Sequence, residues 1–212
     1  MSPSPHLEKE EEFSRKLGYN EPHTPRFERW ISAFLKGKDK SVRILDIGCA
    51  NGNVLKVLSD GGFRDLTGIE QSKSAIAKAK QYGRIIRHDL ENPLPLRDGS
   101  FDIAIAKDVC EHIMRIEQFI SEAHRVLKPG GMLIIGGPNL KSLYHRMRIM
   151  LGRTGHTSIN FGVVHVRWVS YDIFGKWLRP YFDTKPQVFE WYAKPFPTLL
   201  ARSCNIICIK KG

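Results

Sequence analysis

Residues 42–54 read VRILDIGCANGNV, and this stretch decides the fold. An apolar run leads into alternating small residues, Gly48, Ala50 and Gly52, and a helical pattern follows them. Small residues let the backbone turn tightly and approach a ligand, and the helix N-terminus behind them presents unpaired N–H groups. The stretch therefore predicts a strand, a ligand-binding turn and a helix. The spacing disfavours a nicotinamide enzyme, whose glycines follow GxGxxG.

The alternation of strand and helix patterns continues beyond this stretch. Strand-like runs occupy residues 65–70, 84–88, 101–106 and 132–136, with helical patterns at 73–80 and 113–127 between them. Recurring βα units predict a parallel sheet. Outside these units, residues 25–35 and 171–178 predict helices, and the runs at 185–192 and 203–209 predict a closing hairpin.

Three acidic residues, Asp46, Glu70 and Asp89, stand at the ends of three successive predicted strands. An acid at the end of the second strand of a βαβ unit is placed to accept hydrogen bonds from a ribose diol. Asp89 is placed to pair with an exocyclic amine such as that of adenine. Crowded carboxylates repel phosphate and suit a cationic ligand. A turn cap or a solvated strand end is the structural alternative for each acid.

Four motifs together carry a resemblance to a known family: LDIGCANGNV, LTGIEQS, RHDLENPLPLRDGSFDIAIAKDVCEHI and EAHRVLKPGGMLII. The chain resembles a class I S-adenosylmethionine-dependent methyltransferase of the small-molecule type that includes quinone-biosynthesis enzymes, over residues 42–137. The resemblance implies an α/β, Rossmann-like three-layer sandwich. Its seven-stranded, mostly parallel sheet has an antiparallel strand near the C-terminus.

The resemblance also implies that S-adenosyl-L-methionine is the cofactor. Gly48, Ala50 and Gly52 would surround its methionyl part, Glu70 its ribose, and Asp89 with Leu90 its adenine. Two positions depart from the family pattern: Ala50 replaces a commoner glycine, and Lys107 stands where a small or neutral residue is usual. A lysine there is suited to pair with the cofactor carboxylate. The complete predicted cofactor set is Asp46, Gly48, Cys49, Ala50, Gly52, Glu70, Gln71, Asp89, Leu90 and Lys107.

Methyl transfer by in-line displacement needs little covalent help from a protein, because holding nucleophile and methyl group in register supplies about 7–11 kcal/mol. If the acceptor must lose a proton, His112 is the first candidate base and His165 the second. A helix-start role for His112 and a surface or packing role for His165 are the alternatives. The four cysteines show no metal-ligand spacing, so we expect buried thiols and no metal.

Charge is unevenly distributed along the 212 residues. The net charge is +11, and residues 123–212 supply all of it, with 14 basic and 3 acidic side chains. Such a surface attracts an anionic substrate, a nucleic acid or a membrane surface. The first twenty residues have no apolar segment typical of a secretion signal, so we expect a cytoplasmic protein.

We expect one domain with four segments. Residues 1–40 form a helical lid, 41–137 the cofactor-binding core, 138–182 a basic and aromatic substrate cap, and 183–212 the hairpin that completes the sheet. A basic amphipathic helix at residues 140–151 lies in the cap. It either packs its apolar stripe on the sheet as a lid, rests on an anionic lipid surface, or contacts RNA.

The acceptor is expected to be small or lipid-like and anionic or aromatic, because the cap interleaves aromatic and basic residues. Nucleic acid is disfavoured, since the fourth strand is followed by KDVC rather than the Asn/Asp-Pro-Pro-aromatic tetrad of enzymes that methylate flipped bases. Two alternatives stay open: an inactive cofactor-binding partner subunit and an RNA-modifying methyltransferase.

Overall fold

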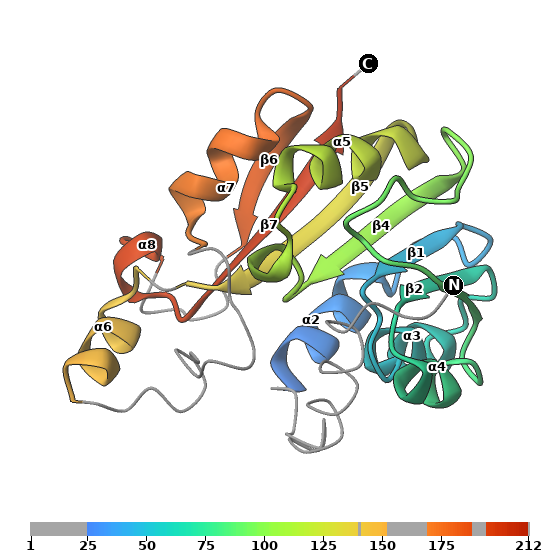
Figure 1. The fold of residues 1–212 in the computed structure, drawn as a ribbon, viewed down its shortest axis with the longest axis horizontal. Coiled ribbons are helices and arrows are strands. Elements are labelled where there is room, and N and C mark those ends of the chain that lie inside the picture. The colour runs from blue at the N-terminus through green and yellow to red at the C-terminus, as the bar shows by residue number, and fades with distance from the viewer. Residues whose placement is uncertain (1–24, 140, 152–168, 188–193, 212) are drawn as a thin grey trace.

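A computed structural model of the chain describes residues 25–139, 141–151, 169–187 and 194–211. Its centre is a seven-stranded sheet in the order β3-β2-β1-β4-β5-β7-β6 (Figure 1). Neighbours are parallel from β3 to β5, whereas β7 is antiparallel to both β5 and β6. This arrangement confirms the predicted Rossmann-like sandwich. The strands are β1 (Ile44–Ile47), β2 (Leu66–Glu70), β3 (Arg84–Arg87), β4 (Phe101–Lys107), β5 (Leu127–Pro138), β6 (Phe182–Gln187) and β7 (Ser203–Lys210).

The helices begin and end largely where local signals place them. Ser72 caps α4 by accepting a hydrogen bond from the N–H of Ala75 at 3.4 Å, and Gly61 ends α3. The predicted bounds of α2 and α7 are confirmed. The helices are α2 (Pro25–Leu35), α3 (Asn53–Asp60), α4 (Lys73–Ala79), the 3-10 turn η1 (Cys110–His112), α5 (Ile116–Val126), α6 (Leu143–Met150), α7 (Tyr171–Leu178) and α8 (Pro197–Leu200).

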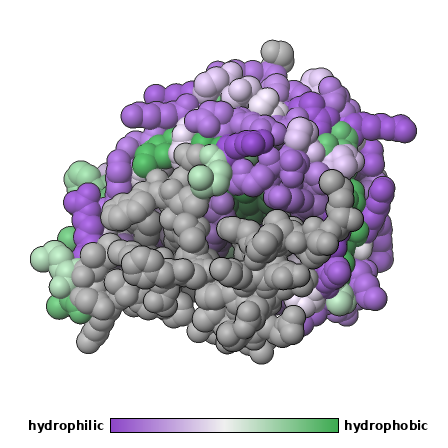
Figure 2. Space-filling view, viewed as in Figure 1, coloured by the Kyte–Doolittle hydropathy of each residue, from purple (hydrophilic) through white to green (hydrophobic). Residues whose placement is uncertain are grey.

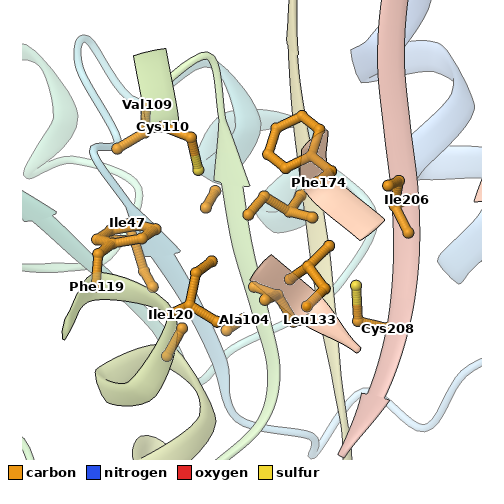
Figure 3. Close-up of a cluster of buried hydrophobic side chains, with 14 of the residues drawn as sticks. Ile47, Ala104, Val109, Cys110, Phe119, Ile120, Leu133, Phe174, Ile206 and Cys208 are labelled. Carbon is orange, nitrogen blue, oxygen red and sulfur yellow. The ribbon is translucent and has the colours of Figure 1, made fainter. Parts of the chain in front are cut away.

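Helices cover both faces of the sheet, which explains why the strands of its centre are apolar on both sides. On one face, α5 and α7 bury a cluster against the strands; Figure 3 shows part of it, with Phe119, Phe174 and Leu133. On the other face, α2 and α3 bury Ile31 and Leu55. The two layers leave the carboxyl ends of β1, β2, β4 and β5 together at one edge of the sheet.

The C-terminal part differs from expectation in two ways. The antiparallel pairing of the last two strands is confirmed, but β6 begins at Phe182 rather than at 185, and α8 lies in the connection. The helix predicted over 140–151 is the shorter α6, and its apolar stripe is not packed on the sheet: Met147 is 52% exposed and Met150 85%. The lid interpretation of that stripe was therefore wrong.

Candidate active site

The loop between β1 and α3 turns through three left-handed residues. Gly48, Ala50 and Gly52 have φ angles of 74°, 44° and 81°. A Cβ on Gly48 would lie 2.7 Å from Cγ2 of Val109, and one on Gly52 would lie 2.9 Å from Cα of Ala79. The loop is therefore pressed against the segment after β4 and against α4, and two of its positions require glycine. Ala50 adopts the same backbone region at a steric cost.

Glu70, the last residue of β2, ties two loops together. Its Oε2 accepts a hydrogen bond from the N–H of Ala50 at 3.0 Å. Its Oε1 accepts from the N–H groups of Gln71 and Ser72 at 2.8 and 2.9 Å. The carboxylate thus fixes the left-handed loop relative to the start of α4, and it brings negative charge to the edge of the sheet.

Asp46 is the most constrained carboxyl group of the site. It is 3% exposed in β1, and among the described residues its Oδ2 has no hydrogen-bond partner. Burial, together with the charges of Glu70 and Glu28, raises the pKa of Asp46 to about 7. Glu28 reaches this group from α2, and its own buried Oε2 is likewise without a hydrogen bond within the described part of the chain. Three carboxyl groups from β1, β2 and α2 therefore share one electrostatic environment.

These residues fit a cationic cofactor. An unsatisfied buried acceptor costs about 1–3 kcal/mol, and a bound donor relieves that cost. S-adenosyl-L-methionine carries an ammonium group and a positively charged sulfur, which the carboxylates of Asp46, Glu28 and Glu70 would attract. A phosphate-bearing dinucleotide would be repelled by the same three groups.

The other predicted cofactor residues lie around this loop, in different roles. Leu90 is beside it, with Cδ1 3.7 Å from the Cβ position of Gly48. Asp89 accepts a hydrogen bond from the N–H of Glu91 at 3.0 Å and so orders the loop after β3. The carbonyl of Gln71 accepts from Nε of Arg87 at 3.0 Å. The side chain of Cys49 is buried towards Gly68, and burial raises the pKa of its thiol.

Lys107 ends β4 on the face that α2 covers. Its ammonium group pairs with the carboxylate of Asp108, a partner inside the chain that the sequence did not suggest. The same group lies 5.7 Å from the ring centroid of Phe27 in α2. Lys107 pairs in register with Gly136, and Gly136 with Asn205, so the three residues form one row across β4, β5 and β7. Asn205 is 1% exposed, and within the described residues its Oδ1 has no hydrogen-bond partner.

The turn η1 separates two neighbouring titratable residues. It directs Glu111 inward, at 2% exposure, and leaves His112 exposed. The buried Oε2 of Glu111 has no hydrogen-bond partner among the described residues. Burial, followed by the charge of Asp108, raises the pKa of Glu111 to about 8, so this group holds its proton at neutral pH. The second candidate base, His165, lies outside the described residues.

Sequence reasoning missed Glu28, Glu111 and Asn205. In the sequence, Glu28 is one of the polar residues of an amphipathic helix. It comes close to Asp46 only because α2 packs on the sheet. Asn205 offered one signal, a polar residue within the apolar run of β7. Glu111 stands in sequence next to a more obvious candidate, His112.

Comparison with known proteins shows a similarity to methyltransferases. The family described as "Methyltransferase domain" matches residues 45–135. A probable S-adenosylmethionine-dependent methyltransferase of Mycolicibacterium smegmatis is 35% identical over 98 residues, which are 45% of this chain and 38% of that protein. A ubiquinone biosynthesis O-methyltransferase of Rickettsia conorii is 31% identical over 135 residues, which are 61% of this chain and 44% of that protein. The chain thus spans less than half the length of these two relatives.

A solved structure extends the likeness to the whole fold. The S-adenosylmethionine-dependent methyltransferase from Thermotoga maritima, described as a possible histamine N-methyltransferase, superposes with a TM-score of 0.69 at 20% identity. The match covers 97% of this chain and all of that one. Residues 45–135 are therefore similar to a methyltransferase domain, and the fold is similar to that of S-adenosylmethionine-dependent methyltransferases.

Proposed function

We propose that this protein transfers a methyl group from S-adenosyl-L-methionine to a small or lipid-like acceptor that carries an anionic or aromatic group. The observation that carries the proposal is the pair of buried, unsatisfied carboxyl oxygens of Asp46 and Glu28 at the left-handed loop. They favour a cation at the place where an open α/β sheet binds its ligand. The resemblance to proteins named for ubiquinone biosynthesis supports a small acceptor.

When bound, S-adenosyl-L-methionine supplies the methyl group on a positively charged sulfur and the leaving group of an in-line displacement. The chain's own residues bind the cofactor and orient it. Asp46 and Glu28 attract positive charge, Glu70 and Asp89 hold polar groups of the nucleoside, and Gly48 permits close approach of the backbone. Positioning of this kind supplies about 7–11 kcal/mol of barrier reduction, so a covalent intermediate is not needed.

The proposed chemistry of the acceptor rests on the row Lys107, Gly136 and Asn205. Lys107, which the resemblance assigned to the cofactor carboxylate, is here proposed to contact the acceptor instead. A lysine ammonium beside the ring of Phe27 suits an anionic group attached to an aromatic one. The Oδ1 of Asn205 is available for a hydroxyl or amine donor on the acceptor. Gly136 leaves no side chain between them. These three residues lie on the α2 face, the same side as Asp46 and Glu28.

His112 remains the proposed base for an acceptor that must lose a proton. It is exposed at the carboxyl end of β4, and its backbone N–H donates to the carbonyl of Val109 at 2.9 Å, which holds the turn. Replacing it with glutamine should remove the acidic limb of the pH dependence of kcat while cofactor affinity is unchanged. His165 is proposed as the second candidate.

The test is transfer of a tritiated methyl group to a panel of acidic phenols, quinone precursors and lipids. Lys107→Met should raise KM for anionic acceptors about tenfold or more and leave neutral acceptors unaffected. Lys128→Met is the matched control, because Lys128 also pairs with an aspartate, Asp102, and lies at the opposite edge of the sheet. Tight cofactor binding without transfer to any acceptor would contradict the proposal and favour an inactive partner subunit.

A further inference from the structure

The helices α6 and α8 carry a patch of exposed apolar side chains, here called the α6–α8 patch. On α6, Leu143, Met147 and Met150 follow one helical face and are 47%, 52% and 85% exposed, and Leu151, directly after the helix, is 66% exposed. Phe196 and Leu199 at α8 are 63% and 43% exposed. In Figure 2 apolar residues gather at the left-hand edge, where Figure 1 shows α6. Scattered apolar residues are ordinary on a surface, whereas a contiguous group marks an interaction site.

The patch is held in place by polar contacts between its two helices and their flanking residues. Asn139, fully buried, donates from Nδ2 to the carbonyls of Ala201 and Thr198 at 2.7 and 3.0 Å, which joins the start of the α6 segment to α8. Nε2 of His145 lies 3.2 Å from the carbonyl of Arg202. The guanidinium of Arg202 lies 4.2 Å from the ring centroid of Tyr144. The two helices therefore present their exposed side chains as one fixed surface.

Within the described parts of residues 139–151 and 194–202, every exposed charged side chain is basic. Neither residues 139–151 nor residues 191–202 contain an acidic residue. Arg146, Lys194 and Arg202 are exposed there. The acid that α7 contributes nearby, Asp172, is paired with Lys141 at 2.6 Å. An apolar face flanked by exposed basic side chains is complementary to an anionic lipid surface.

A second copy of the chain fits this surface less well. A symmetric dimer would place the patch against itself, so the basic side chains of both copies, Arg146 and Arg202 among them, would be brought together at one interface. Like charges at such an interface repel, while lipid phosphates neutralise them.

We propose that the α6–α8 patch docks on the surface of an anionic membrane, with its apolar side chains at the headgroup boundary and its basic side chains on lipid phosphates. The position of the patch has a functional consequence. α6 follows the carboxyl end of β5, and β7, which α8 precedes, begins opposite that end, since Pro138 pairs with Ser203. The patch therefore lies at the same edge of the sheet as Asp46, so a lipid-borne acceptor would be delivered on the side of the cofactor.

The experiment is flotation of the full chain with phosphatidylcholine vesicles and with vesicles that also contain phosphatidylglycerol, without cofactor. Because no turnover is needed, its outcome is independent of the proposed activity. We expect binding to the anionic vesicles only.

Met150→Glu should reduce the bound fraction at least tenfold. Ile209→Glu is the control, because Ile209 is 37% exposed at the opposite end of β7. Arg146→Gln should weaken binding about fivefold, and the exposed Arg97→Gln should leave it unchanged.

The proposal is overturned if the chain does not float with anionic vesicles, if it binds both vesicle types equally, or if Met150→Glu leaves binding to anionic vesicles intact. Light scattering after size-exclusion chromatography tests directly whether the chain forms a dimer. A dimer of the wild type that Met150→Glu converts to a monomer would assign the patch to self-association instead. Circular dichroism of each variant shows that a loss of binding does not come from unfolding.

Discussion

Replacing Asp46 with asparagine is expected to stabilise the folded protein at alkaline pH and to weaken cofactor binding. The substitution keeps the size of the side chain and removes the charge. Burial, with the charges of Glu70 and Glu28, moves the pKa of Asp46 from 3.8 to about 7. The folded state therefore keeps a proton that the unfolded chain releases, and stability falls as the pH rises through this window.

The magnitude follows from the two pKa values. Each pKa unit corresponds to about 1.4 kcal/mol, so ionised Asp46 costs the folded protein about 4 kcal/mol above pH 7. Part of that cost is already present at pH 5, above the pKa of the unfolded chain. The difference in the free energy of unfolding between Asp46→Asn and the wild type should accordingly grow, in favour of the variant, by about 2–3 kcal/mol between pH 5 and pH 8.

The assay is urea unfolding of both proteins at pH 5 and pH 8, followed by tryptophan fluorescence. Glu111, whose pKa burial raises to about 8, affects both proteins equally and cancels in the comparison. Asp183→Asn, at an exposed position of β6, is the control and should show no such growth. Calorimetry at pH 8 should show at least tenfold weaker binding of S-adenosyl-L-methionine to Asp46→Asn. If Asp46→Asn is no more stable than the wild type in urea, or if its extra stability is the same at pH 5 and pH 8, the reasoning is refuted.

Three further predictions concern the same edge of the sheet. Ala50→Gly should raise the free energy of unfolding by up to about 1 kcal/mol, because Ala50 has a φ of 44°; a lower Tm would contradict this. Glu70→Ala should cost about 2–3 kcal/mol in urea unfolding, since three backbone N–H groups lose their acceptor, and an unchanged midpoint would show that water replaces it. Glu111→Gln should stabilise the protein by a few kcal/mol at pH 9 and little at pH 5, because ionised Glu111 is unfavourable where it is buried; equal effects at both pH values would place its pKa elsewhere.

The local signals in the sequence predicted the centre of the site. The pattern of residues 42–54 depends on neighbouring residues alone, and the structure shows the strand, the left-handed loop and the helix there. The end of β2 at Glu70 follows from the same kind of evidence. In each case one short stretch of sequence is enough to predict the local structure, because glycine conformation and strand ends depend on neighbouring residues.

The features that were missed depend on packing between distant segments. Glu28 and Asp46 are brought together by the docking of α2 on the sheet, which no local pattern encodes. The burial of Glu111 beside the exposed His112 depends on how η1 turns against β5. The stripe of α6 has the same period whether it packs on a sheet or faces solvent, so only the structure shows Met150 exposed.

Calorimetric titration of the purified chain with S-adenosyl-L-methionine, and separately with NADH, tests the central claim most directly. We expect binding of S-adenosyl-L-methionine alone, with an affinity that falls as the pH drops below about 7 and Asp46 takes up a proton. Binding of NADH, or binding of neither compound, would contradict the assignment of the carboxylate cluster to a cationic cofactor.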